Sequence, residues 1–184
     1  MNPADQAGSD HVSVAVSGNN AIVKIDGRGS FKTSAALKQF GESVVQKKLP
    51  LVLVDMSACI GMDSTFMGVL AGIATRLRAI NGKIILVNCT PRTFGLIGTL
   101  GLDQLIASHL AGSTPPELTA ILLGLPPGQA LPSVSCKDPE TLRTMILAHE
   151  TIVDLVPQNL PPFKDVIQFL REEAGRKNTA AGKS

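Results

Sequence analysis

A single stretch, LVLVDMSACIGMDSTFMG at residues 51–68, places two elements of the fold. Its first part is a continuous apolar run without polar alternation, which is typical of a central strand covered on both faces. An acid and two hydroxyls follow at residues 63–65, and these residue types are preferred where a helix begins. The stretch therefore predicts a buried strand at 49–56, a loop, and a helix that begins at residue 63.

The flanking sequence predicts the rest of an α/β domain. Two β-rich runs separated by SGNN indicate a hairpin, because that tetrapeptide can supply positive φ. Apolar residues at helical spacing indicate helices, and KIILVNC is a second apolar run typical of a buried strand. The order indicates an open mixed sheet that carries helices, with parallel crossovers after the hairpin. The expected elements are strands at 12–16, 21–25, 49–56 and 83–89, helices at 31–48 and 63–80, and a shorter helix with an edge strand within 90–109.

The composition changes beyond residue 110, where nine of the twelve prolines lie between Pro115 and Pro162. TPPE at 114–117 has the pattern of a capping box, and DPE at 138–140 supplies an Asp cap and a proline for the first turn of a helix. That helix and a last one carry apolar stripes, which we expect to dock on the first 110 residues; burial on a partner chain is the alternative. We divide the chain into a flexible N-terminus (1–10), a domain (11–110), a Pro-rich helical extension (111–177) and a flexible tail (178–184).

Composition and charge exclude several classes of partner. Seventeen basic and fifteen acidic side chains give a net charge of +2, too balanced to indicate nucleic acid or an anionic membrane. Cys59, Cys89 and Cys136 are widely spaced and lie in no metal-ligand pattern, so we expect reduced, mostly buried thiols and no metal site. With no secretory signal and no apolar run long enough to span a membrane, we expect a cytoplasmic protein.

The sequence also has few of the residue patterns that are typical of catalytic sites. A serine nucleophile needs a base, and none of His11, His109 and His149 stands in a triad context. We expect His149, on an apolar stripe, to be a satisfied and partly buried side chain. The glycine-rich segments match no nucleotide-binding motif. We therefore predict that the chain is not an enzyme and takes no cofactor.

Residues 51–106 resemble the STAS family, the sulfate-transporter and anti-sigma-factor-antagonist domain. The resemblance is carried by an apolar strand that ends in Asp55, by DST at 63–65, and by an Arg-containing helix end, a Gly turn, an LVN strand and a GL pair. With the opening hairpin it covers about residues 10–110. It implies an open mixed sheet of four or five strands with helices mainly on one face, to which this chain adds a helical C-terminal extension.

The resemblance also implies a function. Soluble bacterial members of the family are phosphorylated by a partner serine kinase on the serine after the Asp, which is Ser64 here; Thr65 is the competing acceptor. Asp63 would cap the helix and leave the Ser64 hydroxyl pointing outward. The expected protein is an anti-sigma factor antagonist that binds an anti-sigma factor or related kinase until Ser64 is phosphorylated. The alternatives are a constitutive scaffold subunit of a membrane transport ATPase complex, an unrecognised hydrolase whose turnover depends on Ser64, and plain helix capping at residues 63–65.

One departure from the family concerns the residue after DST, where the family usually has Gly and this chain has Phe66. The helix could bury either of two sets, Phe66, Leu70, Ile73 and Leu77 or Met67, Leu70, Ala74 and Leu77. We favour the second set, which places Phe66 at the surface beside Ser64, and we assign partner contacts to Asp63, Thr65, Phe66 and Met67. We expect Asp55 to hold the following loop by accepting backbone amides. The role of the C-terminal helices stays open among dimerisation, self-capping of the domain and a second binding site.

Overall fold

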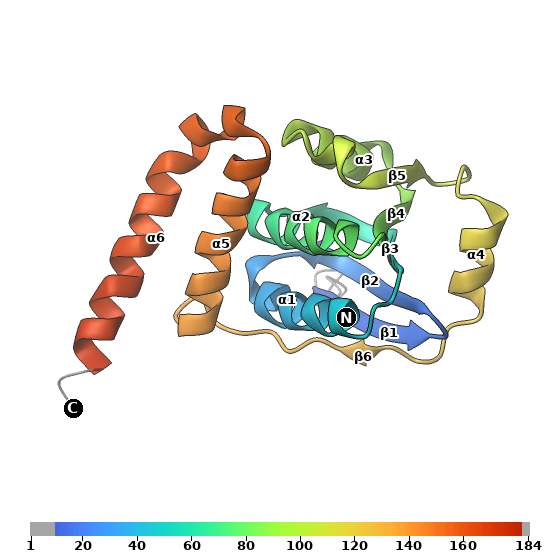
Figure 1. The fold of residues 1–184 in the computed structure, drawn as a ribbon, viewed down its shortest axis with the longest axis horizontal. Helices are drawn as coiled ribbons and strands as arrows, with labels where there is room; N and C mark the ends of the chain where they lie inside the picture. The colour runs from blue at the N-terminus through green and yellow to red at the C-terminus, as the bar shows by residue number, and fades with distance from the viewer. Residues whose placement is uncertain (1–9, 182–184) are drawn as a thin grey trace, which may run out of the picture.

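The computed structural model describes residues 10–181, and the surroundings of side chains up to residue 177. The expected flexible ends lie largely outside these residues, although the last helix continues into the expected tail as far as Ala181. The elements (Figure 1) are β1 (His11–Ser17), β2 (Asn20–Gly29), α1 (Phe31–Gln46), β3 (Leu51–Met62), α2 (Ser64–Arg78), β4 (Lys83–Cys89), α3 (Pro91–Thr99), the 3-10 helix η2 (Leu102–Gln104), β5 (Ala107–Leu110), α4 (Pro116–Leu123), β6 (Gln129–Ala130), α5 (Pro139–Leu155), the 3-10 helix η3 (Pro157–Asn159) and α6 (Leu160–Ala181).

The sheet is mixed, as the sequence predicts, and has the strand order β5-β4-β3-β2-β1-β6. β1 runs antiparallel to both its neighbours, whereas β2, β3, β4 and β5 are mutually parallel. The sheet has six strands where four or five were expected. The extra strand comes from the extension, in which Gln129 pairs with Val14 and Ala130 with Ser13.

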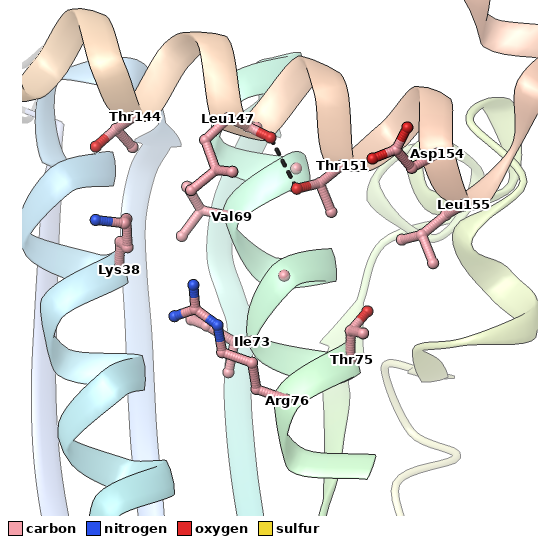
Figure 2. A pocket seen from close by; sticks show the side chains of 13 residues that line it. Lys38, Val69, Ile73, Thr75, Arg76, Thr144, Leu147, Thr151, Asp154 and Leu155 are labelled. Carbon is pink, nitrogen blue, oxygen red and sulfur yellow. Dashed lines mark hydrogen bonds between the residues drawn. The ribbon is translucent and has the colours of Figure 1, made fainter. Parts of the chain in front are cut away.

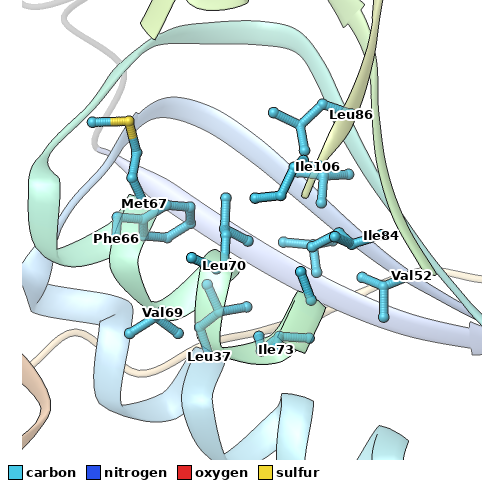
Figure 3. Close-up of a cluster of buried hydrophobic side chains, with 14 of the residues drawn as sticks. Leu37, Val52, Phe66, Met67, Val69, Leu70, Ile73, Ile84, Leu86 and Ile106 are labelled. Atoms are coloured by element: carbon cyan, nitrogen blue, oxygen red, sulfur yellow. The ribbon is translucent and has the colours of Figure 1, made fainter. Parts of the chain in front are cut away.

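Helices cover both faces of the sheet. α1, α2 and α3 enclose the main core on one face (Figure 3), and α4 closes a smaller core on the other. β3 contributes to both, because Val52 and Val54 lie in the main core and Leu53 lies under α4 with Leu118. Residues that alternate between two covered faces explain why the run at 51–54 shows no polar alternation.

Two local predictions need correction. β3 continues to Met62, so the segment expected to be a loop after residue 56 is a strand, which pairs with Asp26–Gly29 of β2 through two register shifts. TPPE forms no capping box, because α4 has Pro115 at its N-cap position and Thr114 instead donates to the Asn88 side-chain oxygen at 3.2 Å. The second helix signal is confirmed: Asp138 accepts the Thr141 amide at 2.8 Å.

The extension folds back on the domain. α5 packs across α2 and α1, and α6 packs on the outer side of α5 (Figure 1). Leu142 and Ile152 of α5 are buried, as the apolar stripe predicts. The expectation that these helices dock on the first 110 residues is confirmed for α5, whose position decides the surroundings of Ser64.

Candidate functional site

Ser64 is the first residue of α2, immediately after the end of β3. Asp63 adopts an extended conformation before the helix, and its Oδ1 accepts the Phe66 amide at 2.8 Å. This is the N-cap that the sequence predicts. The cap places Ser64 in the first helical turn, at the positive end of the helix dipole.

The second oxygen of Asp63 has a role that sequence reasoning missed. Oδ2 accepts the amide of Phe31 at 2.8 Å, and Phe31 is the first residue of α1. The N-cap residue of α1, Ser30, makes no side-chain cap of its own. A single carboxylate therefore joins the N-termini of two helices, and both its oxygens are occupied by amides of this chain.

The Ser64 hydroxyl contacts α5. Ser64 Oγ lies 2.9 Å from Nε2 of His149, and the other ring nitrogen, Nδ1, lies 2.7 Å from the Met145 carbonyl oxygen. Because a carbonyl only accepts, Nδ1 carries a proton, and in the neutral ring Nε2 accepts the hydrogen bond that Ser64 donates. The imidazole is 3% exposed, and its centroid lies 5.0 Å from that of the Phe163 ring of α6. The expected satisfied histidine is confirmed, but its partner was not foreseen.

The serine–histidine contact meets one requirement of nucleophilic catalysis, a hydroxyl beside a base. The ring is oriented by a backbone carbonyl, where a catalytic triad has a carboxylate. A groove of about 270 Å³ does lie between α2 and α5 (Figure 2), but it opens further along α2 and neither Ser64 nor His149 lines it. The geometry is that of a hydroxyl fixed between two packed helices.

That groove separates part of α5 from α2. Its apolar wall includes Val69 and Ile73 of α2 and Leu147 of α5, and Arg76 lies at its edge (Figure 2). Thr144 also lines it, 1% exposed, and its hydroxyl has no hydrogen-bond partner among the described residues. The packing between the two helices is thus incomplete along the groove.

Two expectations about exposure at the site are wrong. Phe66 is 0% exposed rather than at the surface, and it packs against Gly29, where an added Cβ would come within 2.7 Å of the ring. Met67 is buried, as the favoured set predicts, and Thr65 is buried too, so in this structure none of the three presents a surface to a partner. Ser64 is half-buried and its hydroxyl meets His149 rather than pointing into solvent. Both candidate sets of α2 side chains are buried, because the sheet covers one side of the helix and α5 covers another. Figure 3 shows members of both sets, Phe66 and Met67 among them.

Comparison with known proteins identifies the domain. The family model described as STAS domain matches residues 11–114 of this chain. The chain belongs to the STAS domain family. No curated protein sequence matches it significantly.

Several solved structures are similar to part of this chain at low identity. SpoIIAA of Bacillus in its phosphorylated form is 14% identical, with 61% of this chain and 98% of that chain covered and a TM-score of 0.48. An anti-sigma factor antagonist from Mycobacterium paratuberculosis is 23% identical, with coverages of 61% and 92% and a TM-score of 0.49. A variant of RsbS from Moorella thermoacetica is 19% identical, with coverages of 61% and 97% and a TM-score of 0.45.

Asp55 of the STAS domain makes the kind of contact expected of it. Its carboxylate accepts the Ser57 amide and the Ser57 hydroxyl, each at 3.1 Å, and the side-chain amide of Asn88 at 3.0 Å. Asn88 has a positive φ of 58° at the end of β4, and the bond to Asp55 ties that end to β3. The cluster holds the end of β4 against the middle of the parallel strand β3.

Two of the three cysteines, Cys59 and Cys89, lie in the STAS domain, and Cys136 follows it. Cys59 and Cys89 are buried, whereas Cys136, before α5, is exposed; all three are free. Burial raises the pKa of Cys59, and burial together with the neighbouring Cys59 raises the pKa of Cys89 to about 11. Within residues 10–181, no helix has the length and apolarity that crossing a membrane requires, and no cluster of three or more His, Cys, Asp or Glu could hold a metal ion.

Proposed function

We propose that this STAS protein is a regulatory binding protein of the anti-sigma factor antagonist type, and that a partner serine kinase controls it by phosphorylating Ser64. The observation that carries the proposal is DST at the junction of β3 and α2 in a domain of this family. The kinase would transfer the γ-phosphoryl group of ATP to Ser64 Oγ, releasing ADP and the hydroxyl proton. Of the two hydroxyls in DST, Ser64 is half-buried and Thr65 is 3% exposed, which supports Ser64 as the acceptor.

The position of Ser64 suits a reversible charge change. A phosphate at the first turn of a helix is favoured by the helix dipole and by free backbone amides, so modification leaves α2 intact. It adds close to two negative charges beside Asp63, and burying that pair against a partner is costly unless cations meet it. Because about 1.4 kcal/mol corresponds to a tenfold change in affinity, a few kcal/mol of repulsion and desolvation would release a bound anti-sigma factor or kinase.

The test uses the full chain and the serine kinase that co-purifies with it. Incubation with ATP followed by peptide mapping should place one phosphate on Ser64. The Ser64→Ala variant should remain unlabelled, and Thr65→Val, which keeps the buried volume, should be labelled normally. Label that persists on Ser64→Ala would refute the assignment.

A second measurement addresses the charge. Ser64→Asp should bind the kinase or anti-sigma factor more weakly than the unmodified protein, whereas Ser64→Asn, of similar size and without the charge, should bind more tightly than Ser64→Asp. Equal affinities for the two variants would contradict the electrostatic account.

The hydrogen bond between Ser64 and His149 favours a second candidate function. In a constitutive scaffold subunit of a membrane transport ATPase complex, Ser64 would be a structural contact and never a phosphate acceptor. Co-purification with an ATPase, and no label on Ser64 with any co-purifying kinase, would support this candidate.

A further inference from the structure

The segment that covers Ser64 lies outside the residues that match the family model. We call α5, η3 and α6, residues 139–181, the C-terminal arm; the family match ends at residue 114. The arm packs on α2 through α5 (Figure 1). Its tightest approach is at Gly68, where an added Cβ would overlap the Ala148 carbonyl oxygen and lie 2.7 Å from the Ala148 carbonyl carbon. Any residue other than glycine at position 68 would therefore displace the arm from α2.

The arm occupies the space that a modified Ser64 would need. His149 Nε2 stands 2.9 Å from Ser64 Oγ, which is the distance of a direct hydrogen bond. With the Ser64 side chain as it lies, a phosphoryl group on that oxygen would overlap the imidazole, which packs against Phe163 on its other side. A kinase that binds the hydroxyl in this orientation meets the same obstacle. The docked arm thus opposes phosphorylation of Ser64.

The two helices of the arm contact each other directly. Arg171 of α6 pairs with Glu150 of α5 at 2.6 Å, so the two helices are joined by a contact that does not involve the STAS domain. The preceding chain is anchored to the domain up to Val134, whose amide donates to the Lys32 carbonyl at 2.9 Å. Residues 135–138 connect this anchor to the arm. An arm that moves would turn about these residues.

The arm is also held imperfectly. The groove between α2 and α5 removes part of the contact area between them (Figure 2). On the arm's side of the interface Thr144 buries a hydroxyl that finds no partner in the described part of the chain, and such a group opposes docking. The ion pair of Lys38 with Glu140 lies at the partly exposed edge, where its contribution is small.

We propose that the Ser64 face of α2 is an interaction surface that the C-terminal arm occupies from within, and that the arm must swing away before a kinase or an anti-sigma factor can dock. The proposal rests on the proposed function for the identity of the partner, but not for the movement itself. The closed arm shields Ser64 from the kinase. Once Ser64 is phosphorylated, the arm cannot return to its present position. Partner binding and arm closure therefore compete for one surface.

A thiol probe measures the movement without any kinase. Ser64→Cys in a Cys136→Ser background places one reactive group under the arm, because Cys59 and Cys89 are buried. Its rate of modification by iodoacetamide is compared with Gly68→Ala or Gly72→Ala added. Both additions put a methyl group on α2, but an added Cβ at residue 72 meets nothing within 4 Å.

We expect Gly68→Ala to speed modification of the introduced thiol by about tenfold or more, and Gly72→Ala to leave the rate unchanged, since only the first shifts the population toward the open arm. Equal rates for the two variants, with both proteins folded by circular dichroism, would overturn the proposal. If Gly68→Ala does not fold, the His149→Ala variant is used instead. This substitution weakens the contact between the arm and α2 and leaves the sequence of α2 unaltered. A thiol no faster in His149→Ala than in its parent would then overturn the proposal.

The kinase reaction separates this inference from the proposed function. With Ser64 and Cys136 intact, Gly68→Ala should be phosphorylated faster than Gly72→Ala by the co-purifying kinase. If the thiol probe reports opening but no phosphate reaches Ser64, the arm proposal stands and the proposed function fails. If Ser64 is phosphorylated at equal rates in both variants, the proposed function stands and the arm proposal fails.

Discussion

The carboxylate of Asp63 offers a quantitative test of how the Ser64 site is built. One oxygen accepts the Phe66 amide at the start of α2, and the other accepts the Phe31 amide at the start of α1, each at 2.8 Å. Asparagine is as good an N-cap as aspartate, but it replaces one of the two oxygens with an NH₂ group. In Asp63→Asn one of these helix-terminal amides therefore faces a donor and loses its acceptor.

The expected cost follows from these two bonds. One of them survives in asparagine, so the change removes one acceptor from a part-buried amide, which costs about 1–3 kcal/mol. We expect the free energy of unfolding to fall by about 2 kcal/mol, which lowers Tm by about 4–8 °C in a chain of this size. Asp138→Asn is the matched control. It removes the same charge at the start of α5, where a single oxygen accepts both the amide and the hydroxyl of Thr141 and asparagine can still supply it.

Urea denaturation followed by circular dichroism measures the free energy of unfolding of both variants. The comparison holds if the dependence of that free energy on urea concentration has the same slope in the variants and in the parent protein. Asp138→Asn should change the free energy of unfolding by less than about 0.5 kcal/mol. If Asp63→Asn proves as mild as Asp138→Asn, then Asp63 does not join the two helices in the way described. An equal fall in the free energy of unfolding of both variants would indicate that the lost charge, and not the lost acceptor, causes the destabilisation.

Two further outcomes are expected. Phe66→Ala should lower the free energy of unfolding by about 3–5 kcal/mol in urea denaturation, because the ring is fully buried; a loss below about 1 kcal/mol would mean that the ring is not in the core. At pH 8 iodoacetamide should modify Cys136 and spare Cys59 and Cys89, because both buried thiols have raised pKa values and little thiolate at that pH. Peptide mass spectrometry checks this, and rapid labelling of Cys89 in the folded protein would contradict its burial.

The sequence predicts most of the sheet because strands covered on both faces leave a strong local pattern. The apolar run of β3 divides its side chains between two cores, and that division is what the missing alternation indicates. The pattern stops at Met56, where β3 becomes irregular, so the last six residues of the strand were expected to be a loop. β6 has only two residues, and a pair of residues carries no periodicity. Its strand character depends on the partner that β1 offers.

The surroundings of α2 could not be predicted from its own periodicity. Helical spacing allowed two buried faces, and the choice between them assumed that only one would be covered. The structure buries both, because α5 supplies a second cover from about 80 residues further along the chain. The exposure of Phe66 was inferred from the glycine usual in the family, but in this chain the small residue is Gly29, on the facing strand, and the ring fills the space it leaves.

The STAS domain positions Ser64, whereas the C-terminal arm covers it. Asp63 sets the start of α2 through amides of α1 and α2, which lie within residues 11–114, so the backbone of Ser64 keeps its place whether or not α5 is present. His149 and Ala148, which cover it, belong to the arm, which joins the domain through residues 135–138 and also contacts it where the Asn159 side-chain amide donates to the Leu100 carbonyl at 3.0 Å. Removal of the arm thus exposes an acceptor that is already positioned. The contact between α2 and α5 contributes to the free energy that holds the arm closed, which is why one methyl group at Gly68 should alter it and one at Gly72 should not.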